Sequence, residues 1–169
     1  MKGLKTALIA TILTIGLLAG SAFGVAAQTQ ELPRLSSVPE TEANEAAYFD
    51  AFFAQDLDAV MATFTDDAVF EDQTLGDRLE GASAVRGMQQ VVLGLTDAGA
   101  TELLDRFVSS DGNRAVTVLQ WTGTSAVGRP FDLPRVVVHE YRDGRIAKES
   151  LYYAAKDAFA QLTEPPSTE

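Results

Sequence analysis

The spacing of apolar residues divides the chain into a helical half and an extended half. Apolar residues recur at helical spacing up to about residue 95 and alternate with polar ones afterwards, apart from one early extended stretch. The ranges expected to be helical are 41–54, 57–64, 81–95 and 155–162. The ranges expected to be strands are 67–72, 101–109, 114–124, 134–142 and 145–153. Thr41 is expected to cap the first helix.

Two Asp-Gly pairs punctuate the extended half. Asp111-Gly112 and Asp143-Gly144 each stand between alternating segments, which is the strongest short-range signal for a hairpin. Helices followed by an antiparallel meander favour an α+β fold, with the helices packed on one face of a curved antiparallel sheet.

The two ends of the chain have a different character. Residues 1–27 hold two lysines, an apolar run and small residues before Ala27, which predicts a signal peptide and an exported protein, either periplasmic or secreted. If it were not cleaved, the segment could anchor the protein in a membrane. We expect a flexible leader over 28–40, a domain over 41–163 and a disordered tail over 164–169.

Composition excludes several functions. Without Lys2 and Lys5 the remaining chain carries 11 Lys and Arg against 24 Asp and Glu, a net charge of −13, which repels nucleic acid and anionic lipid. We therefore expect no nucleic-acid partner, and no membrane partner once the signal peptide is removed. The chain has no cysteine and one histidine, so a catalytic zinc site and a cysteine nucleophile are not expected. No cofactor is indicated.

Alternation within the strands shows which side chains point inward. In the stretch FTDDAVFEDQ, Ala68, Phe70 and Asp72 share one side of an extended chain, so a carboxylate shares a face with a phenylalanine. Such a carboxylate is suited to remove a proton next to a carbonyl. The alternative is that Asp72 binds a loop amide or caps a turn.

The strand over 134–142 gives a second face assignment. Val137, His139 and Tyr141 share one face with Arg135, while the opposite face ends in two charged residues and is expected to be wet. His139 then faces the helices, either as a hydrogen-bond donor or as a packed core residue. In the last strand we expect Leu151 and Tyr153 to point inward.

Three segments together carry a resemblance. YFDAFFAQDLDAVMATFTDDAVFED, LEGASAVRGM and YRDGRIAKESLYY resemble the nuclear transport factor 2-like superfamily, in its SnoaL-like and ketosteroid-isomerase-like branch, over roughly residues 42–162. The resemblance implies a cone: a curved sheet wrapped around the N-terminal helices, with an internal apolar pocket. It also implies a homodimer.

The resemblance assigns roles residue by residue. Asp72 stands at the position of the general base of ketosteroid isomerases, a family in which the protein environment tunes the carboxyl groups. Tyr48 stands at the position of their oxyanion tyrosine. Their third catalytic group is a protonated aspartate. At its position this chain has Val137 or a neighbour, so the aspartate is missing, and His139 lies two residues after Val137. Tyr152-Tyr153 is followed by Ala154, where cyclases of this branch often carry an acid.

The catalytic hypothesis therefore rests on Asp72, Tyr48 and His139, although Tyr48 also suits a core position. A small apolar molecule would be the ligand of the pocket. Three functions stay open: a cofactor-free isomerase, cyclase or dehydratase acting on a carbonyl compound, a non-catalytic binding protein, and a dimerisation module. The residues expected to line the pocket are Phe52, Phe70, Trp121, Val137, Tyr141, Leu151 and Tyr153.

Overall fold

The computed structural model describes residues 36–162. The expected signal peptide, most of the leader and the tail over 164–169 lie outside the described residues. The helices are α1 (Val38–Phe53), α2 (Leu57–Ala62), α3 (Ala82–Leu95) and α4 (Ala155–Leu162). The strands are β1 (Phe64–Asp72), β2 (Asp77–Glu80), β3 (Glu102–Val108), β4 (Arg114–Thr124), β5 (Pro130–Arg142) and β6 (Arg145–Tyr153).

The first helix starts earlier than its apolar pattern indicates. Ser37 is the N-cap, and its backbone N–H donates to the Glu40 carboxylate at 3.0 Å, which is half of a capping box. Thr41, expected to be the cap, is instead buried, and its hydroxyl donates to the Gly112 carbonyl. The helix therefore includes residues that the sequence assigned to the leader.

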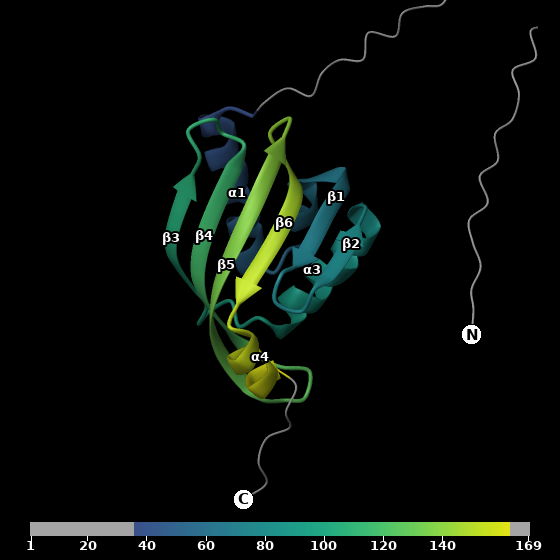
Figure 1. Ribbon diagram of the computed structural model, residues 1–169, viewed down its shortest axis with the longest axis vertical. Coiled ribbons are helices and arrows are strands. Elements are labelled where there is room, and N and C mark those ends of the chain that lie inside the picture. Colours follow the sequence, from purple (N-terminus) through teal and green to yellow (C-terminus); the bar gives the residue numbers. More distant parts are fainter. Residues whose placement is uncertain (1–35, 163–169) are drawn as a thin grey trace, which may run out of the picture. The chain divides into compact units, whose positions relative to one another are not determined.

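The six strands form one sheet in the order β2-β1-β6-β5-β4-β3. Figure 1 shows this curved, unclosed sheet from one side, with α1 and α3 against its other face and α4 at the end where β6 finishes. Neighbouring strands are antiparallel except β1 and β6, which run parallel, and all the other strands come between these two in the sequence. The α+β fold with its curved sheet and N-terminal helices is confirmed.

The Asp-Gly turn between β5 and β6 fixes the register of the last hairpin. Arg142 pairs with Arg145, so Asp143 and Gly144 form a two-residue loop, and both have positive φ, at 53° and 72°. Positive φ at both central residues is characteristic of a type I′ turn, whose backbone twist matches the twist of the two strands it connects. The turn brings the inner face of β6 beside the inner face of β5.

The inner face of the sheet is buried as the alternation predicts. On β5, Arg135, Val137, His139 and Tyr141 are all buried. β1 lies on the opposite edge of β6 from β5, and its residues Ala68, Phe70 and Asp72 are buried as well. On β6, Leu151 is buried and Tyr152 is exposed, in agreement with the inward assignment of Leu151. Within residues 36–162, none of the helices is long and apolar enough to span a membrane.

Candidate functional site

An apolar pocket of about 150 Å³ opens between the inner face of the sheet and α3. Its walls come from β1, β4, β6, α3 and α4, and its polar groups are Asp72, Asp77 and Tyr153. An engineered protein cavity of about this volume holds benzene, so the enclosed space accepts a ring of that size. The apolar side chains that line the pocket are Phe70, Leu75, Met88, Val91, Val92, Leu95, Trp121, Leu151 and Leu162.

Asp72 ends β1 at the wall of this pocket and accepts three hydrogen bonds. Its Oδ1 accepts the backbone N–H groups of Thr74 at 2.9 Å and Leu75 at 2.8 Å, and its Oδ2 accepts the hydroxyl of Tyr153. The structural alternative for Asp72, binding a loop amide, is therefore present. A carboxylate has about four lone-pair sites, so one site remains on Oδ2.

Tyr153 is the partner of Asp72 in the pocket wall. Burial and the hydrogen bond to Asp72 raise the pKa of its phenol above the ordinary value, so the hydroxyl stays protonated and keeps its role as donor. Its backbone N–H also bonds the Thr74 hydroxyl at 3.1 Å, which ties the end of β6 to the loop after β1. The pair is thus held by both strands.

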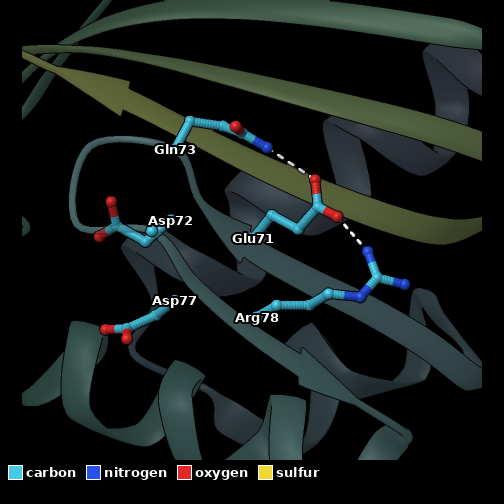
Figure 2. A pocket seen from close by; sticks show the side chains of 6 residues that line it. Glu71, Asp72, Gln73, Asp77 and Arg78 are labelled. Atoms are coloured by element: carbon cyan, nitrogen blue, oxygen red, sulfur yellow. Dashed lines mark hydrogen bonds and ion pairs between the residues drawn. The ribbon is translucent and has the colours of Figure 1, made fainter. Parts of the chain in front are cut away.

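A second carboxylate faces Asp72 across the β1–β2 hairpin. Asp72 and Asp77 are register partners, and Figure 2 shows their carboxylates on the same side of the hairpin. Glu71 and Arg78 form an ion pair on the other side, and all four residues border a surface hollow of about 360 Å³. Asp72 is buried, with 7% of its surface exposed, whereas Asp77 is exposed to solvent. The hairpin therefore supplies one buried and one solvated acid.

Tyr48 and His139 lie together in the core, and neither belongs to the lining of the apolar pocket. Their rings meet edge to face with centroids 4.7 Å apart. The Tyr48 hydroxyl donates to Glu149 Oε2 at 3.2 Å and lies 3.4 Å from Gln89 Oε1. Because the hydroxyl is fully buried and already has partners, Tyr48 is not placed to bind a ligand in this pocket.

His139 lies between two buried glutamates. Its Nδ1 is 2.7 Å from Glu45 Oε2 on α1, and its Nε2 is 3.4 Å from Glu149 Oε2 on β6. Thr117 donates to Glu45 at 2.6 Å, and Tyr141 also donates to it. We call Glu45, Tyr48, Gln89, His139 and Glu149 the core cluster.

The charges of the core cluster stabilise one another. Burial alone would lower the pKa of His139, but the charge of Glu45 and hydrogen bonds to both glutamates raise it to about 9. Burial alone would raise the pKa of Glu45, but His139 and three hydrogen bonds lower it to about 2. Burial and the charge of Glu149 raise the pKa of Tyr48. At neutral pH His139 is therefore an imidazolium paired with a carboxylate.

Arg135 is a buried cation at the edge of the core cluster, and it was not predicted from the sequence as a site residue. It is 2% exposed, its guanidinium lies 4.8 Å from the centroid of the Trp121 ring, and its Nη2 is 3.7 Å from Glu149 Oε1. Within the described residues, its Nε and Nη1 and the Glu149 Oε1 atom have no hydrogen-bond partner. Arg135 thus keeps unused donors in the interior.

The structure divides the expected pocket residues into two groups. Phe70, Trp121, Leu151 and Tyr153 line the pocket with Asp72, whereas Phe52, Val137 and Tyr141 are buried in the core outside its lining. Glu45, Glu149 and Gln89 were not predicted from the sequence as site residues. Glu149 shares the inner face of β6 with Leu151, so alternation could have found it. Among residues 36–162, no group of three or more acidic or histidine side chains is arranged to bind a metal ion.

A curved sheet folded over N-terminal helices, with a pocket at one end, defines the nuclear transport factor 2-like class of fold. The model of the SnoaL-like domain family matches residues 46–149, which is more than half of the chain. The chain therefore belongs to the SnoaL-like domain family, and the resemblance seen in the sequence is confirmed. A search of curated protein sequences finds no match.

Solved structures with this fold include candidate polyketide cyclases. One from Pseudomonas putida KT2440 is 23% identical with a TM-score of 0.62, over 73% of this chain and 98% of that chain. One from Silicibacter sp. TM1040 is 24% identical with a TM-score of 0.63, over 78% and 100%. SalBIII, an epoxide hydrolase/cyclase-like enzyme with a role in pyran ring formation in the polyether salinomycin, is 21% identical with a TM-score of 0.59, over 70% and 94%. At these identities the similarity concerns the fold.

Proposed function

We propose that this protein binds a small apolar carbonyl compound in the pocket and removes a proton from its α-carbon with Asp72, as a cofactor-free isomerase, cyclase or dehydratase. The observation that carries the proposal is the remaining acceptor site on Asp72 Oδ2, at the wall of an otherwise apolar pocket. A base must lie within hydrogen-bond reach of the proton it takes, and Asp72 is one of the residues that line the space for the ligand. The candidate polyketide cyclase and the epoxide hydrolase/cyclase-like enzyme among the solved structures with this fold are consistent with it.

Tyr153, and not Tyr48, is the tyrosine beside Asp72, and its role differs from the oxyanion donor expected at Tyr48. Its hydroxyl donates to the same Oδ2 oxygen that would receive the proton, so it orients the carboxylate. His139 and Tyr48 do not line the pocket and act only indirectly. The core cluster they form with Glu149 supports the inner face of β6. In this proposal Asp72 is the catalytic residue, and Tyr153 positions it.

The pocket volume limits the ligand. At about 150 Å³ it is smaller than the range of roughly 300–1,000 Å³ typical of sites for drug-sized molecules. A six-membered ring fits, and a larger ligand must extend through the mouth. Cyclohexanone, an enolisable ketone of this size, is therefore a suitable probe.

Deuterium exchange at the α-carbon of cyclohexanone tests the proposal. Asp72→Asn keeps the size and amide contacts of the side chain but removes the proton acceptor, so exchange should fall by about 10²–10⁴-fold while binding persists. Asp66→Asn is the matched control, because it removes an exposed acid of the same strand that does not line the pocket and should leave exchange unchanged. Wild-type protein that binds cyclohexanone without exchanging any α-proton would refute the enzyme and favour a non-catalytic binding protein.

The outer face of the sheet supports a second proposal, that the protein forms a homodimer. Val116, Val118, Val136 and Val138 lie adjacent on this face in β4 and β5, opposite the face that α1 and α3 cover (Figure 1). An apolar sheet face suits a self-complementary contact about a twofold axis. Val136→Asp should then yield a monomer in analytical ultracentrifugation. A monomeric wild type would contradict the proposal.

We also propose that residues 1–27 are a signal peptide and that the mature protein acts outside the cytoplasm. The support is the order of lysines, apolar run and small residues in the sequence. The intact mass of protein recovered from the native host tests it. A chain beginning near Gln28 outside the cytoplasm is expected, and a membrane-bound species retaining Met1 would contradict it.

A further inference from the structure

The proposed reaction lacks a donor for the carbonyl oxygen. When Asp72 takes the α-proton, the C–H electrons form a carbon–carbon double bond and the carbonyl π electrons move to the oxygen. The enolate oxygen then needs a hydrogen-bond donor or a positive charge. Tyr153 already donates to Asp72, and the Tyr48 hydroxyl donates to Glu149 in the core.

Arg135 has the donors that the reaction needs. It is almost fully buried, yet its Nε and Nη1 have no partner among the described residues, and its contact with Glu149 at 3.7 Å is longer than a hydrogen bond. Buried hydrogen-bond donors without acceptors are costly, so an acceptor brought by a ligand would be bound strongly.

The register of the sheet places Arg135 at the pocket end of the inner face. Arg135 is the β5 partner of Tyr153 on β6, and Tyr153 lines the pocket. His139 is the partner of Glu149, two rungs of this face further into the core. The guanidinium also lies against the ring of Trp121, a second lining residue. Arg135 is therefore directly behind the pocket wall.

We propose that Arg135 is a second catalytic residue, which donates from Nε or Nη1 to the carbonyl oxygen of the ligand and stabilises the enolate. This inference rests on the proposed function and adds the group that the reaction lacks. The negative charge moves from Asp72 to the ligand oxygen beside Arg135, and Arg135 stays protonated throughout. Asp72 then returns a proton or a solvent deuteron to the α-carbon.

The ligand reaches Arg135 when the Trp121 side chain shifts, because Arg135 is behind the lining and not part of it. Trp121 Nε1 donates to Thr96 at 2.8 Å, so the shift breaks one hydrogen bond. Changes of side-chain rotamer on this scale are common on binding. Trp121 is the only tryptophan in the chain, so its fluorescence reports the shift directly.

The proposal selects neutral ketones and aldehydes as ligands. Asp72 and Asp77 place two carboxylates at the pocket, which repel a ligand that is already anionic. A neutral carbonyl avoids this repulsion and becomes anionic only as Asp72 is neutralised. The protein's overall negative charge acts in the same direction.

The carbonyl stretching frequency of bound cyclohexanone, labelled with ¹³C at the carbonyl, tests the contact without needing turnover. A hydrogen bond from a guanidinium lowers this frequency in wild-type protein and in Asp72→Asn. The shift should be absent in Arg135→Met and partly restored in Arg135→Lys, which keeps a charge. Arg106→Met is the matched control, because Arg106 also stacks on an aromatic ring but lies on the edge strand β3.

The rate of α-proton exchange gives the second readout. Removing one donor to an oxyanion typically costs about 10²–10³-fold, so Arg135→Met should lose that factor while Arg106→Met keeps the wild-type rate. If Arg135→Met does not fold, the double variant Arg135→Met/Glu149→Gln serves in its place, because it removes both members of the buried Arg135–Glu149 ion pair. The fold of each variant is checked by circular dichroism.

The two proposals fail in different ways. An unshifted carbonyl band in wild-type protein, or the same shift in Arg135→Met, would overturn the role of Arg135 even if Asp72-dependent exchange occurs. A shifted band that depends on Arg135, without any exchange, would overturn the proposed reaction and leave Arg135 as a binding residue only. An unchanged Trp121 emission on binding would contradict the side-chain shift and with it the contact.

Discussion

Raising the pH should destabilise the protein through a single residue, His139. The folded protein raises the pKa of His139 from 6.5 to about 9, through Glu45 first and then the hydrogen bonds to both glutamates. A pKa raised on folding stabilises the protein fully below about pH 6.5, and this contribution is lost as the pH rises through about 9. The pKa difference of about 2.5, at about 1.36 kcal/mol for each pKa unit, corresponds to roughly 3 kcal/mol.

At low pH the contribution of Glu45 to stability changes in the opposite direction, because it is lost as the pH falls. The pKa of Glu45 falls from 4.5 to about 2 on folding, so its contribution is present above about pH 4.5 and is lost as the pH falls through about 2. The two values describe the same ion pair from its two ends and are not added. The stability contributed by this pair should therefore be greatest between about pH 4.5 and 6.5.

Urea unfolding followed by the fluorescence of Trp121 measures the effect. Between about pH 6 and 10, the free energy of unfolding should fall by roughly 3 kcal/mol with an unchanged dependence on urea. The chain has one histidine and no cysteine, so few other groups titrate in this range. The charged and titratable groups around the imidazole are Glu45, Glu149, Tyr48 and Tyr141, with Arg135 beyond Glu149.

Glu45→Gln/His139→Gln is the matched variant, because replacing His139 alone would leave the Glu45 carboxylate buried without its cation. Glutamine at both positions keeps hydrogen-bonding side chains but has no titrating group, so the stability of this variant should be flat between about pH 6.5 and 9. A wild-type stability that stays constant over this range would refute the raised pKa. An equal fall in the double variant would show that another group is responsible.

Two further predictions concern a glycine contact and the buried tyrosines. Gly123→Ala should lower the free energy of unfolding by about 3 kcal/mol, because the added Cβ would lie 1.9 Å from the Leu95 carbonyl oxygen. Gly94→Ala is the control, because open space surrounds Gly94, and urea unfolding measures both variants. Tyr48, Tyr141 and Tyr153 have raised pKa values, so they should stay protonated at about pH 11 while the protein is folded, and tyrosinate absorbance should rise fully only on unfolding.

Local signals account for most of the fold that the sequence predicts. β4 over 114–124 and β6 over 145–153 have the bounds expected from alternation and the Asp-Gly turns. β2 was not predicted, because its four residues Asp77–Glu80 carry no apolar alternation and form a strand only by pairing with β1. The start of α1 was assigned to the leader because Pro39 suggests a loop, although proline is well tolerated in the first turn of a helix.

The candidate site was only partly predictable, because alternation gives the face of a residue but not its depth. Asp72, Tyr48 and His139 are all buried. Pairing between strands then separates them: Asp72 is beside Leu151, whereas His139 is beside Glu149, one rung away along β6. Successive rungs on one face are about 6.6 Å apart. Only the register, which depends on the fold, shows that Asp72 borders the pocket and His139 the core.

The same register explains why the interior contains so many charges. A lone buried carboxylate or cation would be too costly, but Glu45, His139, Glu149 and Arg135 together carry two charges of each sign. Glu149 Oε2 takes part in three hydrogen bonds, whereas Glu149 Oε1 and the Nε and Nη1 donors of Arg135 have no hydrogen-bond partner within the described residues. Arg135, which carries these donors, pairs across the sheet with Tyr153, and Tyr153 lines the pocket. A ligand carbonyl that reached Arg135 would therefore supply the acceptor that the folded chain does not provide.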